Sequence, residues 1–219
     1  IELPETRTDF RDRHVLIVVR GPNYKRDLKV LQAYIRDMKP ILVGVDGGAD
    51  AIRDAGHRPD MILGDMDSAT DRTLKSGAEL IVHGYSDGRA PGRQRLLDLG
   101  VEHTVLPSVG TSQDVAMLMA FEKGADLIVT VGAHFNLIEF LDKDRDGMSS
   151  TFLTRLRIGE VLIDAKGVSR LYKPGLSVGP LFMFLGAFLV LAVIVILSSP
   201  ALADLAELIW LKLKIWLGL

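Results

Sequence analysis

The sequence predicts an α/β fold, a doubly wound and mostly parallel sheet, followed by a transmembrane helix. Short apolar runs alternate with segments of helical spacing along most of the chain, which is typical of strands buried on both faces of a parallel sheet. Glycine and polar residues gather where these runs end, and ligands bind at that place in open sheets of this class. Near the end of the chain, seventeen consecutive residues, 181–197, carry no charge and no strongly polar group.

Six apolar runs are predicted to form the strands of the sheet, and two segments between them have clear helical spacing. The first helical segment is residues 23–37, with Asn23 as a possible N-cap, and the second is residues 112–124, which ends at Gly124. The predicted strands occupy residues 14–19, 41–45, 61–63, 79–85, 102–108 and 126–132. Strands separated by helices favour βαβ units over a sandwich or barrel.

Four segments are predicted along the chain. They are a linker from a missing amino-terminal part at residues 1–13, an α/β domain at 14–175, a transmembrane helix at 176–198 and an amphipathic helix at 199–219. The uncharged stretch would span roughly 26 Å as a helix, close to the hydrocarbon thickness of a bilayer. The alternative is a buried core helix. A second span is the alternative for the final segment, but its four charges argue against it.

Flanking charge predicts the orientation of the span. Five basic residues precede it and two follow it: Arg155, Arg157, Lys166, Arg170 and Lys173, then Lys212 and Lys214. By the positive-inside rule, the large domain is expected to lie in the cytoplasm. The protein is expected to be a single-pass protein of the cell membrane. The final helix, with its charges on one arc and its tryptophans on the other face, is typical of a helix that lies in the membrane interface or packs on a partner's segment.

Composition excludes several classes of function. The 219 residues have a net charge of −2, which gives no electrostatic case for binding nucleic acid. There is no cysteine, so disulfides and thiolate metal sites are excluded. Neither a dinucleotide-binding glycine motif nor a P-loop occurs in the sequence.

The stretch "PDMILGDMDS", residues 59–68, runs an apolar strand into two carboxylates. Asp65 and Asp67 are two residues apart, so in extended geometry their side chains point to the same side. Carboxylates placed together repel one another unless a cation lies between them, and magnesium with a phosphate ligand is the usual occupant. The alternative is that Asp65 caps the next helix and Asp67 makes a turn. The stretch alone supports both.

Three other predicted strand ends carry polar groups that would share one cleft with these aspartates. In "RGPNYKRD" the cations Arg20 and Lys25 flank a strand-to-helix turn, a place that suits phosphate binding. The alternative is that this is an ordinary solvated turn. In "DGGAD", Asp46 ends a strand, and Gly47 and Gly48 would allow the backbone to approach a ligand closely. The alternative is that the following helix simply needs small residues at its start.

The last of these strand ends is "GTSQD". Thr111 or Ser112 can cap the following helix, and Asp114 lies in its first turn, where the helix dipole alone would favour a carboxylate. In "SDGRAPGR", Arg89 is a further candidate for gripping phosphate, with a solvated turn as the alternative.

Together "VDGGADAIRDAGHRPDMILGDMDS" resembles the catalytic domain of the thiamine pyrophosphokinases, whose pattern couples a D-G-G-A strand end to a P-D-x-x-x-G-D-x-D-S strand end. The resemblance implies that Asp46, Asp65 and Asp67 coordinate magnesium or handle nucleotide phosphates, with Ser68 beside them. Asp114 is similar to the aspartate of the family's T-D-x-x-x-A-L helix. After "IVTVGA", however, the enzymes' glycine-arginine-aspartate-histidine element is absent, and so is room for their thiamine-holding β-sandwich.

The remaining blocks, "SDGRAPGRQRLLDLG", "GTSQDVAMLMAFEKGADLIVTVGAHFNLIEFLDKDRDGMSSTFLTRLRIG" and "LIDAKGVSRLYKP" before a single span, resemble the SteA-type bacterial cell-division proteins of the thiamine pyrophosphokinase-like superfamily. This resemblance implies a homodimer that acts in cytokinesis and cell separation. It also implies a SteB-like membrane partner, control of peptidoglycan hydrolysis and an amino-terminal domain before residue 1.

Two functions follow as expectations. The first is a membrane-anchored regulator of division that binds magnesium with a nucleotide or other phosphate ligand, without turnover. The second is an active magnesium-dependent pyrophosphokinase that transfers diphosphate from ATP to an acceptor other than thiamine. The lost arginine-aspartate-histidine element and the missing substrate domain favour the first.

Overall fold

The computed structural model describes residues 3–133, 148–171, 178–198 and 200–217. The chain divides into two compact units, Ile1–Pro174 and Gly175–Leu219. Each unit is described by itself.

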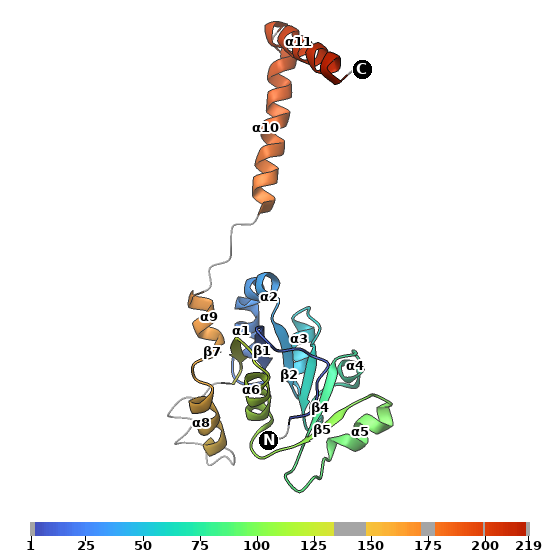
Figure 1. Ribbon diagram of the computed structural model, residues 1–219, viewed down its shortest axis with the longest axis vertical. Helices are drawn as coiled ribbons and strands as arrows, with labels where there is room; N and C mark the ends of the chain where they lie inside the picture. Colours follow the sequence, from blue (N-terminus) through green and yellow to red (C-terminus); the bar gives the residue numbers. More distant parts are fainter. Residues whose placement is uncertain (1–2, 134–147, 172–177, 199, 218–219) are drawn as a thin grey trace. The chain divides into compact units, whose positions relative to one another are not determined.

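The first unit is built on a seven-stranded sheet in which every pairing is parallel, with the strand order β5-β4-β3-β2-β1-β6-β7 (Figure 1). The strands are β1 (His14–Val18), β2 (Ile41–Val45), β3 (Met61–Gly64), β4 (Glu79–Gly84), β5 (Thr104–Pro107), β6 (Leu127–Val131) and β7 (Leu162–Asp164). All six predicted strands are present, and the predicted parallel α/β class is confirmed. β7 is an addition at the sheet edge, paired with β6.

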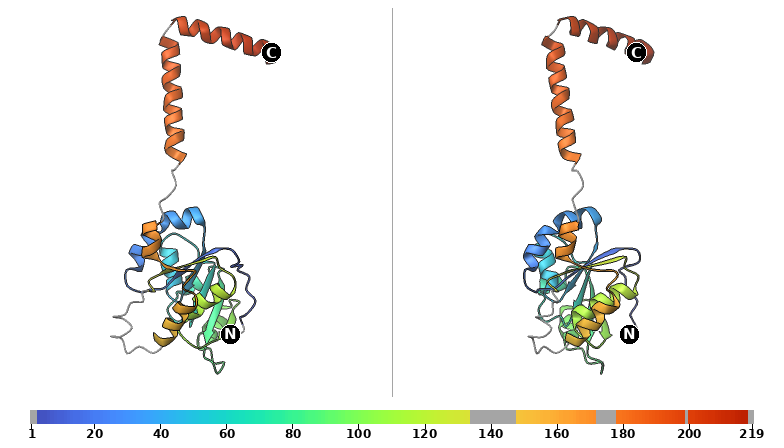
Figure 2. Two further views of the ribbon diagram at one scale, coloured as in Figure 1. Left: turned by 60° about the vertical axis from the view of Figure 1, so that its left-hand side comes forward. Right: turned by 90° about the vertical axis from the view of Figure 1, so that its left-hand side faces the viewer.

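Helices cover both faces of this sheet, as the unbroken apolar strands require (Figure 2). One face packs against α6 (Ser112–Glu122) and, through α6, against α8 (Met148–Arg157). The other face carries α1 (Tyr24–Val30), α2 (Gln32–Met38), α3 (Gly48–Asp54), α4 (Asp71–Leu74), α5 (Gly92–Leu99) and α9 (Ala165–Leu171). Because all seven strands are parallel, their carboxyl ends lie along one edge of the sheet.

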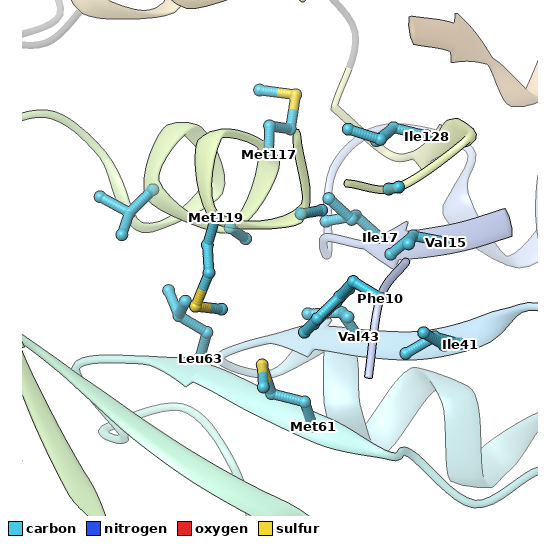
Figure 3. Close-up of a cluster of buried hydrophobic side chains, with 14 of the residues drawn as sticks. Phe10, Val15, Ile17, Ile41, Val43, Met61, Leu63, Met117, Met119 and Ile128 are labelled. Carbon is cyan, nitrogen blue, oxygen red and sulfur yellow. The ribbon is translucent and has the colours of Figure 1, made fainter. Parts of the chain in front are cut away.

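The segment predicted as a linker packs on the α/β domain. Phe10 is 1% exposed and lies in the core between α6 and strands β1 to β3 (Figure 3). The backbone amides of Arg7 and Thr8 donate to the Glu79 carboxylate at 2.8 and 2.9 Å, and the Thr8 hydroxyl donates at 2.6 Å. Glu79, which begins β4, thus ties the first residues of the chain to the amino-terminal edge of the sheet.

The helix predicted over residues 23–37 is two helices. The chain breaks at Leu31, which caps α1 and begins α2, and its side chain is buried in the core. Asn23 occupies the N-cap position of α1, as predicted, but it has a left-handed conformation, φ 63°, and its side chain makes no cap hydrogen bond. The apolar spacing continues through the break, which is why periodicity alone does not reveal it.

The second unit consists of α10 (Val178–Ser198) and α11 (Pro200–Leu217), which contact each other. The described side chains of α10 from Phe182 onward are largely exposed and apolar. Within the described part of the chain, no helix is both long and apolar enough to cross a membrane, so the predicted span finds no support there.

Candidate functional site

The carboxyl ends of β2 and β3 bring two of the predicted aspartates together. Asp46 follows β2 with a positive φ of 47°, and its Oδ1 accepts a hydrogen bond of 3.3 Å from the backbone amide of Met66. Gly64, with φ 156°, lies directly beneath this carboxylate, because a Cβ built there would be 1.7 Å from the Asp46 Oδ1. The glycine in front of the aspartates therefore makes room for the aspartate of the neighbouring strand.

Asp65 and Asp67 are both exposed, and a turn between them replaces the extended geometry that the sequence predicts. Met66 between them has a φ of 64° and a fully buried side chain, which anchors the turn in the core. The Asp65 Oδ1 accepts a hydrogen bond of 3.1 Å from the Asp67 amide, and Ser68 Oγ donates to Asp67. Asp65 does not cap the next helix, since Thr70 occupies the N-cap position of α4.

The electrostatics of this corner differ from one carboxylate to the next. Burial, followed by the charge of Asp65 and a hydrogen bond with it, raises the pKa of Asp46 to about 7. The pKa of Asp67 is instead lowered, first by the hydrogen bond from Ser68 and next by one from Asp65. Asp46 is thus the group on which a bound cation would act most strongly, because a cation favours the ionised form of a carboxyl.

Behind these aspartates, Asp50 of α3 connects the end of β1 to the start of α4. Its buried carboxylate accepts hydrogen bonds from the Thr70 amide and hydroxyl, from the Thr73 hydroxyl, and from Arg20 Nη2 at 3.3 Å. Burial opposes ionisation, yet these donors together hold the pKa of Asp50 below its ordinary value. Arg20 is thereby held beside Gly47, where a Cβ would be 2.9 Å from the arginine Cδ.

A hollow of about 760 Å³, named here the strand-end pocket, opens at the carboxyl ends of β3, β4 and β5. Asp65 and Asp67 line one side of it. The other lining residues come from the ends of β4 and β5 and the starts of α5 and α6; they are Met66, His83, Gly84, Tyr85, Ser86, Pro91, Gly92, Arg95, Ser108, Val109, Gly110, Thr111 and Ser112. Its volume exceeds the lower limit typical of small-molecule sites.

Sequence reasoning missed His83 and Tyr85 as members of this pocket. The His83 ring contacts the Ser112 hydroxyl at 3.1 Å and the Ser108 carbonyl oxygen at 3.2 Å, so it joins β4, the end of β5 and α6. Tyr85 is exposed at the rim, with the Arg89 guanidinium 5.3 Å from its ring centroid. The available signal was their place at the end of a predicted strand.

Arg95 supports the aspartate turn from α5. Its guanidinium donates to the carbonyl oxygens of Met66, Asp67 and Ala69 and to the Asp71 carboxylate. Such multiple contacts with backbone carbonyls fix the position of the turn, so Arg95 acts on the acidic pair through the backbone between them.

The start of α6 is a complete capping box. The Thr111 hydroxyl accepts from the Asp114 amide, and the Asp114 carboxylate accepts from the Thr111 amide, each at 3.3 Å. Asp114 is fully buried and also accepts from Thr151 at 3.0 Å. Thr111 and Ser112 line the strand-end pocket, whereas Asp114 lies behind them as part of the helix start.

The structure does not bring all the predicted site residues together. Lys25 lines a separate hollow between α1 and α3. Arg89 pairs with Asp87 at 2.7 Å, close to the pocket rim but outside its lining. Gly48 has a structural role, because its Cβ would be 1.9 Å from the Val18 carbonyl oxygen, where α3 meets β1. Residues 134–147, which follow "IVTVGA", lie outside the described residues.

The fit of the acidic corner to magnesium follows from its donor set. Among the described residues, no group of three or more His, Asp or Glu side chains is arranged to hold a metal ion by itself. Magnesium, however, usually takes one or two carboxylates and completes its shell with water and substrate phosphates. Asp65 and Asp67, with Asp46 beside them, suit that mode and not an all-protein cage.

Residues 166–217, which include α10 and α11, match the family of the SteA-like C-terminal domain. Over these residues the chain is similar to the SteA-like proteins. The SteA-type resemblance predicted from the sequence is thereby confirmed.

Eight chains of solved structures match the fold. One is the thiamine pyrophosphokinase from Bacillus subtilis, at 23% identity and a TM-score of 0.41; the match covers 69% of this chain and 60% of that enzyme. The aligned region therefore spans less than two thirds of the enzyme's length. No curated protein matches the sequence.

Proposed function

We propose that this SteA-like chain is a membrane-anchored regulator of bacterial cell division whose α/β domain binds a magnesium–phosphate ligand in the strand-end pocket. The observation that carries the ligand site is the pair Asp65 and Asp67 in the lining of a pocket of about 760 Å³, with Asp46 in contact with Asp65 and Met66 next to it. In this proposal ligand occupancy, and not turnover, changes how the domain engages a membrane partner or a second copy of the chain.

The pocket supports a phosphate ligand through its donors as well as its carboxylates. The Thr111 and Ser112 side chains and the start of α6 line the side opposite the acidic pair, and helix amino-termini favour anions. A phosphate group between these two sides would meet hydroxyl donors on one side and, through a shared cation, carboxylates on the other.

Membrane attachment is the part of the proposal that the described helices do not support, so it needs a test of its own. Its basis is the uncharged sequence of residues 181–197 and the exposed phenylalanines Phe182, Phe184 and Phe188. The flanking basic residues favour a cytoplasmic α/β domain. We expect the full chain to float with neutral phospholipid vesicles, and we expect this flotation to persist at high salt.

The ligand site is tested by calorimetric titration of the full chain in detergent with ATP, ADP and diphosphate, each with and without magnesium. We expect magnesium-dependent binding that is reduced at least tenfold, as expected when charged contacts to a ligand are lost, in the Asp65→Asn/Asp67→Asn double variant. Asp98→Asn, an exposed aspartate on α5 outside the pocket lining, is the matched control.

Two results would reject the ligand site. Binding that is equal with and without magnesium, or equal in the double variant and the control, shows that the aspartates do not hold the ligand. Release of AMP from ATP in the presence of magnesium would instead favour the pyrophosphokinase alternative, which uses the same residues with turnover.

A further inference from the structure

We propose that the surface formed by α1, α3 and α9 binds anionic phospholipid headgroups and seats the α/β domain on the membrane. This inference rests on the membrane attachment in the proposed function, and it assigns a role to the cations of α1, which the strand-end pocket does not use. The decisive feature is a second hollow, of about 440 Å³, between α1 and α3; we name it the α1–α3 pocket.

The α1–α3 pocket combines cationic walls with an apolar floor. Lys25 and Lys29, one helical turn apart on α1, line it together with the Tyr24 ring, and Leu28 and Ala51 form its buried base. Lysine ammonium groups are strong donors for phosphate, and the apolar base suits the glycerol and first methylenes of a lipid. A free phosphate ion would use the lysines and leave the apolar base without a partner.

The surroundings of the pocket have the same character. Arg26 is exposed beside the two lysines, whereas Asp27, the carboxylate of the same helix, is buried and so contributes less to the outer surface. Val30 is also 51% exposed at the end of α1. Exposed lysine and arginine are each worth about 1 kcal/mol near an anionic membrane surface, so this helix alone supplies a substantial attraction.

This surface and the proposed anchor are close in the sequence, through α9. α9 packs beside α1, and its Lys166 is exposed. Six residues separate the end of α9 from the start of α10. If α10 binds lipid, the local concentration of headgroups at α1 and α9 is high, and modest affinity of each site is sufficient.

The α1–α3 pocket is also lined by one carboxylate. Replacing it is expected to have the opposite effect on lipid contact from replacing a lysine. Asp54 of α3 lies among the lining residues and faces the lysines across the pocket. A carboxylate there weakens the attraction for a headgroup phosphate. Asp54→Asn is therefore expected to strengthen lipid contact, whereas Lys25→Gln is expected to weaken it.

The experiment reconstitutes the full chain into vesicles of phosphatidylcholine, alone or with about one third phosphatidylglycerol, and measures acetylation of individual lysines by mass spectrometry. The readout is the labelling of Lys29 relative to Lys123, which lies at the end of α6 on the opposite face of the sheet. Because both lysines belong to the same molecule, this ratio does not depend on which way the chain inserts.

We expect phosphatidylglycerol to lower the Lys29 ratio about threefold. The effect should be smaller in Lys25→Gln and larger in Asp54→Asn. An unchanged ratio in vesicles that do carry the chain would overturn the lipid surface while leaving the anchor in place. Equal protection by inorganic phosphate with neutral vesicles would also overturn it, in favour of a soluble phosphate ligand.

Flotation of the same samples separates this inference from the proposed anchor. A chain that floats only with phosphatidylglycerol supports the lipid surface and contradicts the anchor. A chain that floats with neither vesicle contradicts both. Flotation with neutral vesicles supports the anchor, and the lysine ratio then decides the surface.

Discussion

At the scale of single residues, the acidic corner is organised by what lies between its carboxylates. Met66 turns its side chain into the core and leaves Asp65 and Asp67 on the outside, while Gly64 leaves space for Asp46. The pairing of Asp65 and Asp67 was predictable from their spacing. The positive φ of Met66 and the contact with Asp46 were not, because both depend on the register between β2 and β3.

The raised pKa of Asp46 predicts how stability depends on pH. An unfolded aspartate titrates near 3.9, and this one titrates at about 7 in the folded chain. The folded state therefore holds the extra proton between these values, and stability falls as pH rises from about 4 to about 7. Asp46→Asn should stabilise the metal-free chain at pH 8 by on the order of 4 kcal/mol and change its stability little near pH 4.

Denaturant unfolding of both proteins in detergent with a chelator present measures this difference at the two pH values. Asp98→Asn serves as the control for loss of an exposed charge. A gain of the same size at pH 4 and pH 8 would show that the effect of Asp46→Asn is unrelated to its titration.

At the scale of elements, the sequence predicted those strands and helices whose signals lie within one short segment of the chain. The strands followed from apolar runs, and α6 followed from a cap residue, helical spacing and a terminal glycine, all within one short segment. Leu31 shows the opposite case, since it satisfies the helical period and its side chain is buried, and yet the chain breaks there between α1 and α2. β7 is three residues long and is defined by its pairing with β6, so its own sequence carries little signal.

The capping box of α6 leads to a prediction that separates a structural role from a ligand role for Thr111. Thr111→Ala should destabilise the chain by about 1 kcal/mol, because the Asp114 amide loses its acceptor at the helix start. Thr111→Ser retains the hydroxyl and should restore stability. Thermal unfolding compares the three proteins; a loss in Thr111→Ser as large as in Thr111→Ala would show that the methyl group, and not the cap, is responsible.

At the scale of the whole molecule, the α/β domain includes residues of the segment that the sequence pattern predicted to be a linker. Phe10 belongs to the same buried cluster as β1, β2 and α6, although it lies outside every strand and helix (Figure 3). A lone aromatic residue in a polar segment gives no periodic signal. Only the finished sheet, with Glu79 at its amino-terminal edge, creates the place where this segment lies.

Phe10→Ala should therefore destabilise the domain by about 3 kcal/mol, through lost burial and the cavity that remains. Phe10→Leu should cost less, because it fills most of the same space. Urea unfolding, followed by the ellipticity of the helices, measures both. If Phe10→Ala leaves the midpoint unchanged, the segment contributes nothing to the domain's stability.

The tie between the first residues and Glu79 also constrains how the protein is made. Arg7 and Glu79 are 72 residues apart, so during synthesis the first segment leaves the ribosome well before its acceptor exists. Before that point β1 can pair with β2, but its other edge still lacks β6, and the face that carries Phe10 still lacks its cover, α6. A truncated chain that stops before β4 is therefore expected to be degraded rapidly, because this apolar face and the Arg7 and Thr8 amides have lost their partners.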